Sequence, residues 1–318
     1  MFNTDIILQL QQFDYPIIHW FMVLISALGT SAVVLPFIMI ITFGVDFRKG
    51  LILLNVVAWT TILTFILKDQ INFPRPVDVD SRVNTVYFEK TNQDLSEVQP
   101  IDFLESFSSE VLDKTRNDEW VRHVFPSGHA SVQVALWLSL YFLFRRRKVL
   151  YAGIFMVVST FISRLYLAHH FLGDVIGGVL LGAIVASLLL LLVQKSGYLT
   201  AISHQFKSLS ILWIPIFLVP FVFYTPIWVL GGLIGLNSSA ALIILQRNFP
   251  VFHVITWKRI STALVTLLLV LGAYFLTDLI DQINRAGIEL IVIILLNFFV
   301  VWGSIQICNR LNLIRFRF

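Results

Sequence analysis

The chain has 318 residues, of which 57% are hydrophobic and 13% are charged, and its mean hydropathy is +0.83. Soluble domains average about 25% charged residues, so the composition excludes an ordinary soluble protein and indicates a polytopic membrane protein. The formal net charge of +4 does not indicate a nucleic-acid-binding protein, because the basic residues lie in short loops between apolar runs.

The first 28 residues leave two interpretations open. Apolar residues recur over residues 6–13 and 17–21 in the manner of a helix that lies in the membrane interface, and Pro16 and His19 interrupt the pattern. A segment that crosses the membrane is the alternative. Residues 1–12 lack the basic region that begins a cleaved signal peptide.

Apolar runs follow along the rest of the chain, and they predict an all-α fold, a polytopic membrane helical bundle. The runs cover residues 33–43, 51–67, 130–144, 149–168, 172–193, 209–245, 260–276 and 290–307. The run at 209–245 is too long for one span, and Thr225-Pro226 predicts a turn between two spans. Four glycines of the 172–193 run predict close helix contact, namely Gly173, Gly177, Gly178 and Gly182.

The charges in the loops predict the orientation. Grouping alternate loops places on one side Arg48, Lys49, Arg145, Arg146, Arg147, Lys148, Lys195, Lys207, Arg247, Lys258, Arg259, Arg310, Arg315 and Arg317, opposed by Asp46 alone. The other side holds the polar loop at 77–122, which has eleven acidic and five basic residues. The positive-inside rule then predicts that the basic side and the C-terminus face the cytoplasm.

One stretch between two apolar runs, residues 163–174, carries reactive side chains. His170 and Asp174 are four residues apart, so on a helix they would share a face. A carboxylate bound to one imidazole nitrogen fixes the tautomer and leaves the other nitrogen able to attack. Arg164 offers a planar guanidinium suited to phosphate oxygens. Ionisable groups are costly at the membrane edge, so this cluster indicates a functional site.

Two further stretches supply more cations and a second histidine. Lys68 and Arg75 lie at the end of an apolar run, in the sequence KDQINFPRP. Residues 125–129 read FPSGH, which predicts a turn before a helix N-terminus, a place that suits an anion. Taken alone, Lys68 and Arg75 are equally typical of interfacial residues, and His129 of a helix start. Arg164 with Asp174 alone is typical of a structural ion pair.

In order, the three motifs are K-x6-R-P, P-S-G-H and S-R-x5-H-x3-D. This set resembles the type 2 phosphatidic acid phosphatase superfamily, in its membrane lipid phosphatase branch; the superfamily also includes glucose-6-phosphatase and vanadium haloperoxidases. The resemblance covers residues 33–193. It implies a six-helix-type phosphatase core over residues 1–200, with a non-cytoplasmic loop at 77–122. Residues 201–318 lie outside it as an additional transmembrane region of about four helices with no assigned role.

The resemblance implies a metal-independent phosphoric monoester or diphosphate hydrolase without a cofactor. His170 is then the nucleophile that forms a phosphohistidine, Asp174 orients it, and His129 protonates the leaving group. The substrate phosphate is expected to be bound by Lys68, Arg75, Ser127, Gly128 and Arg164. His169 would point about 100° away from His170 on a helix, so we expect it outside the reacting group or at the surface.

These expectations favour an integral membrane phosphatase that acts on a lipid phosphate or diphosphate at the non-cytoplasmic face. The compatible lipids are undecaprenyl diphosphate, phosphatidylglycerophosphate and phosphatidate. A lipid phosphotransferase with the same site is one alternative, and a non-enzymatic transporter or scaffold is another. We expect a bacterial inner-membrane protein with a periplasmic active site and a lipid substrate as its partner. A homo-oligomer formed through the C-terminal helices stays open.

Overall fold

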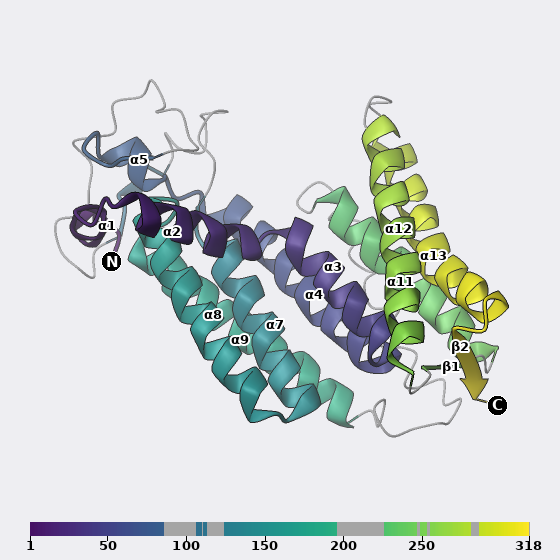
Figure 1. Cartoon of the computed structure of the whole chain (residues 1–318). Coiled ribbons are helices and arrows are strands. Elements are labelled where there is room, and N and C mark those ends of the chain that lie inside the picture. Colours follow the sequence, from purple (N-terminus) through teal and green to yellow (C-terminus); the bar gives the residue numbers. More distant parts are fainter. Residues whose placement is uncertain are drawn as a thin grey trace. The chain divides into compact units, whose positions relative to one another are not determined.

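The computed structural model describes residues 1–85, 106–109, 111–112, 124–195, 226–246, 249–252, 255–280 and 286–317 (Figure 1). The chain divides into two compact units. Unit 1 consists of Met1–Val33 and Trp59–Ser187, and unit 2 consists of Val34–Ala58 and Leu188–Phe318. The boundaries fall inside three helices, so each unit holds part of those helices.

The N-terminal segment of the chain is broken at Pro16. Helix α1 covers Asp5–Gln11 and helix α2 covers Pro16–Leu28, with Pro16 in the first turn and Gly29 as the C-cap. Proline suits this position because its missing N–H has no intrahelical partner there. Helix α3 (Ser31–Gly44) follows, and α2 and α3 together are apolar and long enough to count as one bent span.

Helix α4 (Phe47–Ile71) is longer than the apolar run that predicted it, because polar residues extend both ends. The helix ends at Asn72, which adopts φ 56 and donates its backbone N–H to the Lys68 carbonyl oxygen. Asparagine tolerates this left-handed conformation better than most residues. The chain then turns into the short helix α5 (Pro76–Val79), whose N-cap is Arg75.

Three helices complete the described part of unit 1. They are α7 (Gly128–Phe144), α8 (Arg147–Tyr166) and α9 (Leu172–Lys195), of which α9 continues into unit 2. Helix α9 approaches the backbone of α7 closely, because a Cβ at Gly178 or Gly182 would overlap the carbonyl oxygens of Ser127 and Ser131. The close contact predicted for these two glycines is therefore confirmed.

The C-terminal elements of unit 2 among the described residues are three helices and two short strands. The helices are α11 (Ile227–Leu245), α12 (Thr256–Ile280) and α13 (Ala286–Arg310), and strands β1 (Phe249–Phe252) and β2 (Ile314–Arg317) pair antiparallel. Helix α11 packs closely on α13, because a Cβ at Gly235 would overlap the Ile294 carbonyl oxygen. Helix α11 begins directly after Pro226, while the other span expected within 209–245 lies outside the described residues.

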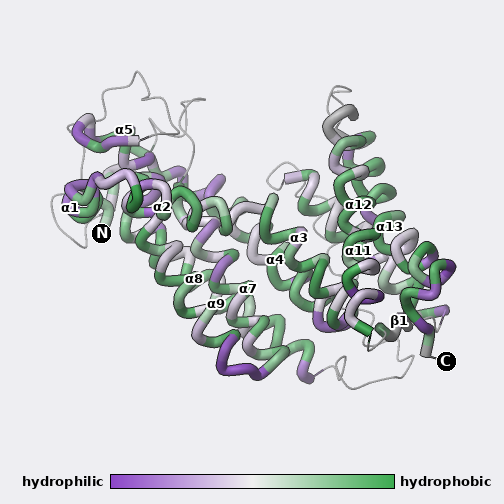
Figure 2. Tube along the Cα trace, viewed as in Figure 1, coloured by the Kyte–Doolittle hydropathy of each residue, from purple (hydrophilic) through white to green (hydrophobic). Residues whose placement is uncertain are grey.

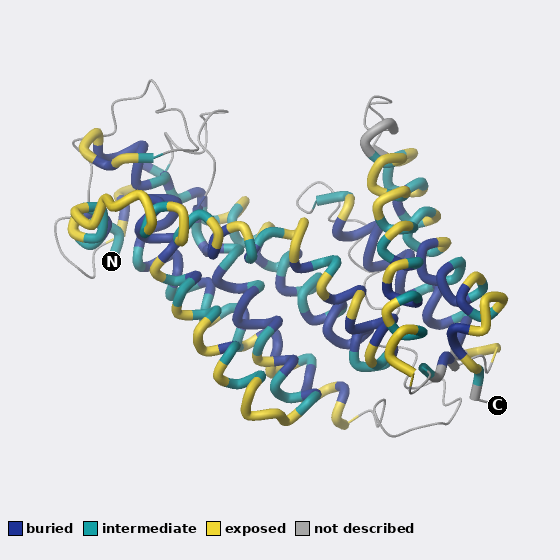
Figure 3. Tube along the Cα trace, viewed as in Figure 1, coloured by how far each residue is buried: buried dark blue, intermediate teal, exposed yellow. Residues whose placement is uncertain are grey.

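Five described helices are long and apolar enough to cross a membrane, and the bent pair α2 and α3 makes up to six. Helices α7 and α11 are apolar but shorter. Figure 2 shows the apolar flanks of these helices between polar ends, and Figure 3 shows exposed residues along their outer sides. Exposed large apolar side chains include Ile154, Phe155, Leu180, Ile184, Leu268 and Leu271. Side chains of this kind suit contact with lipid, and the chain is an integral membrane protein of the all-α class.

Candidate active site

The predicted site residues lie at neighbouring helix ends within unit 1. Lys68 lies in the last turn of α4, Arg75 caps α5, Ser127 and Gly128 begin α7 with His129 next to them, and Arg164 lies in the last turn of α8. His170 lies in the turn between α8 and α9, and Asp174 lies in the first turn of α9. Helix ends therefore bring the three motifs together.

The contact between His170 and Asp174 forms differently from the prediction. His170 precedes α9, so the expectation that both residues share a helical face is wrong. Asp174 Oδ2 accepts a hydrogen bond of 2.8 Å from the Phe171 backbone N–H, as the third residue of a capping box does at a helix start. The same oxygen lies 3.5 Å from His170 Nδ1. The helix cap thus brings the carboxylate to the imidazole, and a contact of this length typically tightens when substrate binds.

The turn that carries the two adjacent histidines has an unusual backbone. Ala168 adopts φ 54, a left-handed conformation that is uncommon for residues other than glycine. Strained backbone of this kind is frequent at functional sites, where surrounding contacts hold it in place. Here the His169 N–H donates to the Arg164 carbonyl oxygen at 3.1 Å, which ties the turn to the end of α8.

The second and third motifs are joined through the backbone. The Ser127 N–H donates to the Asp174 carbonyl oxygen at 2.9 Å, so the start of α7 is fixed against the first turn of α9. The Ser127 hydroxyl is fully buried and has no hydrogen-bond partner among the residues that the structure describes. Leaving such a group unsatisfied costs about 1–3 kcal/mol, so a bound oxygen anion would relieve that cost.

The three cations are anchored at different points around the histidines. Lys68 Nζ donates to the Val124 carbonyl oxygen at 3.1 Å, and Arg75 Nη1 donates to the His169 carbonyl oxygen at 3.4 Å. Arg164 Nη1 donates to the Ser26 hydroxyl at 2.6 Å. Arg164 Nε is buried and makes no hydrogen bond within the described part of the chain. The guanidinium is therefore held at one end and retains a donor for a ligand.

The charges around His170 determine its protonation. Burial lowers the pKa of His170 well below its ordinary value of 6.5, and the nearby positive charges of Arg164, Lys68 and Arg75 lower it further. The pKa of His169 is lowered in the same way, by burial and then by Arg164 and Arg75. The imidazole of His170 is consequently neutral at neutral pH, the form that a nucleophile or base requires.

A cluster of phenylalanine rings packs beside the site. Its members are Phe2, Phe73, Phe107, Phe125 and Phe171. Phe73 lies in the first motif, Phe125 directly before the second and Phe171 in the third. Phe2 contacts all four others at centroid distances of 4.9–6.2 Å. Edge-to-face pairs add to the free energy that ring burial supplies. The N-terminal Phe2 thus packs against every motif.

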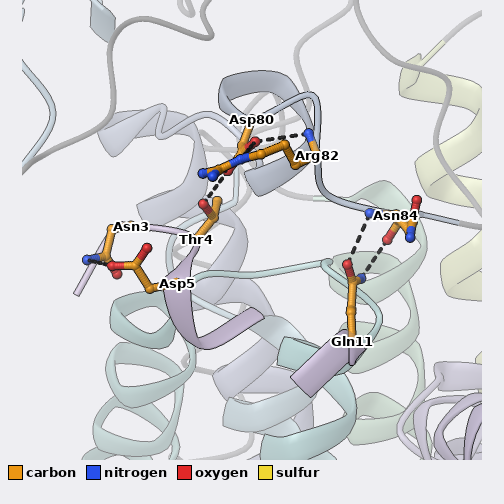
Figure 4. Close-up of polar contacts among 7 residues, drawn as sticks. All are labelled: Asn3, Thr4, Asp5, Gln11, Asp80, Arg82 and Asn84. Carbon is orange, nitrogen blue, oxygen red and sulfur yellow. Dashed lines mark hydrogen bonds and ion pairs between the residues drawn. The ribbon is translucent and has the colours of Figure 1, made fainter. Parts of the chain in front are cut away.

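Polar contacts fix the N-terminal segment against the chain after the first motif (Figure 4). The Thr4 hydroxyl donates to Asp80, and Gln11 exchanges hydrogen bonds with the backbone of Asn84. Arg82 makes two hydrogen bonds to the Asp80 carboxylate, which raises the pKa of its guanidinium. Arg82 is therefore bound to Asp80 and is not one of the three cations of the site.

Two features of the site were not predicted from the sequence. His169 is buried, with 6% of its surface exposed, so the surface position considered for it is wrong. Ser26, which binds Arg164, lies in an apolar helix, and nothing in its spacing distinguished it. Among the described residues, no group of three or more His, Cys, Asp or Glu side chains is placed to hold a metal ion.

The comparison with known families agrees with this arrangement. The model of the PAP2 superfamily matches residues 49–198. This match is consistent with a member of the type 2 phosphatidic acid phosphatase superfamily. No curated protein and no solved structure gives a significant match to the chain.

The PAP2 region contains every predicted site residue, from Lys68 to Asp174. PAP2 superfamily members are generally phosphatases. Together with the apolar helices, the PAP2 match supports a membrane protein of the phosphatase type. Helices α1, α2 and α3, and the described helices from α11 onwards, lie outside the PAP2 region.

Proposed function

We propose that the chain is an integral membrane phosphatase that hydrolyses a lipid phosphate or diphosphate through a phosphohistidine intermediate. The observation that carries the proposal is the contact of His170 Nδ1 with the buried Asp174 carboxylate at 3.5 Å, beside the charges of Lys68, Arg75 and Arg164. A neutral imidazole oriented by a carboxylate is a nucleophile, and three cations favour a phosphate as its target.

In the first step, His170 Nε2 attacks the phosphorus atom while Nδ1–H stays directed at Asp174. A P–N bond forms and the bond from phosphorus to the leaving oxygen breaks. His129 donates a proton to that oxygen, so the lipid alcohol or lipid phosphate leaves with its leaving oxygen protonated. Asp174 stabilises the positive charge that develops on the imidazole of His170.

In the second step, water attacks the phosphorus atom of the phosphohistidine. His129, now deprotonated, accepts a proton from that water, the P–N bond breaks, and inorganic phosphate and the starting His170 result. Throughout, Lys68, Arg75 and Arg164 bind the equatorial oxygens, with the Ser127 hydroxyl and the Gly128 N–H as further donors. Preorganised donors of this kind are worth about 10²–10³-fold in rate each.

The position of the site at helix ends favours a lipid substrate. A headgroup phosphate at the membrane surface would reach the ends of α4, α7, α8 and α9 while its chains stay in the hydrocarbon region. Undecaprenyl diphosphate, phosphatidylglycerophosphate and phosphatidate all have this form.

The ends of the same helices support a non-cytoplasmic site. In α8, Arg147 and Lys148 lie in the first turn and Arg164 in the last, about 25 Å away. Helix α7 has the reverse order, with His129 at its start and Arg145 as its C-cap. By the positive-inside rule the basic ends would face the cytoplasm, which supports our proposal of a site on the periplasmic side of a bacterial inner membrane.

Phosphate release by the purified full chain in detergent tests the proposal. The substrates are undecaprenyl diphosphate, phosphatidylglycerophosphate, phosphatidate and glucose 6-phosphate, each with EDTA present, and His170→Ala is compared with the wild type. We expect release from at least one lipid, and we expect His170→Ala to abolish it. Folded wild-type protein that releases phosphate from none of them would contradict a hydrolase. Phosphate transfer to an added lipid alcohol would then favour the phosphotransferase.

A further inference from the structure

The last turn of α2 contacts two residues of the site, although it lies outside the PAP2 region. Arg164 Nη1 donates to the Ser26 hydroxyl at 2.6 Å, and both side chains are buried. The imidazole of His129 packs on Gly29, because a Cβ at that glycine would lie 2.8 Å from His129 Cδ2. Arg164, the proposed phosphate-binding residue, and His129, the proposed proton donor, therefore both contact the end of α2.

Further hydrogen bonds hold the C-terminal half of α2 against the two helices that carry Arg164 and His129. On α8, the Ser163 hydroxyl donates to the Met22 carbonyl oxygen at 2.7 Å. On α7, the buried Gln133 amide, one turn after His129, donates to the Leu28 carbonyl oxygen at 3.0 Å. The C-terminal half of α2 is thus fixed on both sides.

We propose that the last turn of α2 is a positioning element of the phosphatase site. Ser26 sets the orientation of the Arg164 guanidinium, and the lack of a side chain at Gly29 sets the position of the His129 imidazole. The inference rests on the proposed function, in which Arg164 binds phosphate and His129 protonates the leaving oxygen.

The physical reason lies in the shape of the guanidinium. It is planar and presents its N–H groups in a fixed fork, so holding Nη1 at Ser26 fixes the directions of the other donors. One of these, Arg164 Nε, is buried and has no partner among the residues described, which leaves it available to a phosphate oxygen. Without the Ser26 hydroxyl, the guanidinium would turn to satisfy Nη1 elsewhere, and the fork would no longer match the phosphate.

The Ser26 contact is tested by Ser26→Ala, alone and combined with Arg164→Lys. The two readouts are the affinity for inorganic orthovanadate, a phosphate mimic, and kcat/KM for phosphatidate. We expect Ser26→Ala to lower both about tenfold, and to change them less than about twofold when Arg164 is already lysine. The matched control is Thr160→Ala, which removes a buried hydroxyl of α8. It should leave the vanadate affinity and kcat/KM unchanged.

Equal losses in the wild-type and Arg164→Lys backgrounds would mean that Ser26 only supports the fold, and would overturn its positioning role. An unchanged vanadate affinity in Ser26→Ala would overturn it as well. Wild-type protein that binds vanadate but hydrolyses no lipid would contradict the proposed function. The vanadate affinities of the single and double variants would still decide the role of Ser26. Wild-type protein that binds no vanadate would overturn both.

The Gly29 contact is tested by Gly29→Ala with two substrates. An added methyl group would displace the His129 imidazole, so we expect kcat for phosphatidate to fall about tenfold or more. For p-nitrophenyl phosphate, whose leaving group needs no proton, the loss should stay below about threefold. Equal losses for both substrates would overturn the inference. Gly272→Ala is the control, because a Cβ there meets no atom within 4 Å.

Discussion

His170 Nδ1 lies 3.5 Å from Asp174 Oδ2, although the two residues do not share a helix. The carboxylate reaches the imidazole because it caps α9 through the Phe171 N–H. The Asp174 side chain therefore both caps a helix and orients the proposed nucleophile.

Asp174→Asn should keep most of the helix cap and lose the charge that orients His170. We expect kcat for phosphate release to fall about 10³–10⁴-fold, as removal of the carboxylate does in comparable triads. Asp46→Asn is the matched control, because Asp46 accepts a hydrogen bond from the Lys49 N–H at the start of α4. A comparable loss of activity in both variants would show that the effect is one of helix capping alone.

The buried histidines predict how stability depends on pH. The pKa values of His169 and His170 are lowered in the folded protein, so the unfolded chain binds protons more readily below pH 6.5. Their stabilising effect is complete above pH 6.5 and is lost as the pH falls, by up to about 1.4 kcal/mol per pH unit for each group. The apparent Tm in detergent should therefore fall from pH 7.5 to pH 5.

His169→Asn should reduce the slope of the apparent Tm against pH, because one of the buried histidines with a lowered pKa is gone. His19→Asn is the control, since His19 is not among the charges that act on the site. An apparent Tm that is flat over this range, or that rises as the pH falls, would contradict the neutral state of these histidines.

Much of the site was predictable from the sequence, and the reason is local. Lys68, His129 and Asp174 each lie within a few residues of a helix end, and helix ends are marked by apolar run length and by proline and glycine. The alternation of basic loops then placed those ends on one side. Both signals depend only on residues that are close in the sequence, so they can be recognised without knowledge of the fold.

The parts that escaped prediction depend on contacts between distant residues. Ser26 meets Arg164 only when α2 packs on α8, and an apolar helix gives no periodic signal for such a contact. The turn before α9 includes Ala168 at φ 54, which no propensity for alanine predicts. The four-residue spacing of His170 and Asp174 therefore predicts a shared helix that the structure does not have.

The phenylalanine cluster predicts a role for Phe2 outside the PAP2 region. Phe2→Ala would remove ring contacts with each motif and should lower the free energy of unfolding by about 2 kcal/mol. Activity should fall with it, since Phe171 and Phe125 flank the site residues. Phe13→Ala is the control, because 58% of that side chain is exposed. Equal apparent Tm values for the two variants would contradict the packing described.

An amide pair within unit 2 predicts coupling between α4 and α11. Asn55 Nδ2 donates to Asn237 Oδ1 at 2.9 Å, and Asn237 Nδ2 donates to Asn55 Oδ1 at 2.8 Å. Each single change to leucine should destabilise the protein by about 1 kcal/mol, and the double change should cost less than the sum. Thermal unfolding in detergent measures the cycle. Additive losses would exclude a direct interaction.

Asn297→Leu is the control for the amide pair, because the Asn297 amide binds the Ile293 carbonyl oxygen of its own helix. Its change should show no coupling to Asn55→Leu. Coupling of similar size in both pairs would indicate a general loosening of unit 2 instead of a specific contact.

The most direct test of the account is to trap the covalent intermediate. The wild-type protein is mixed with a lipid phosphate that it hydrolyses, quenched at alkaline pH where phosphohistidine survives, digested, and analysed by mass spectrometry beside His170→Ala and His169→Asn. We predict a phosphoryl group on His170 in the wild type and in His169→Asn, and none in His170→Ala. A phosphoryl group on His129 or His169, or turnover that continues in His170→Ala, would contradict His170 as the nucleophile.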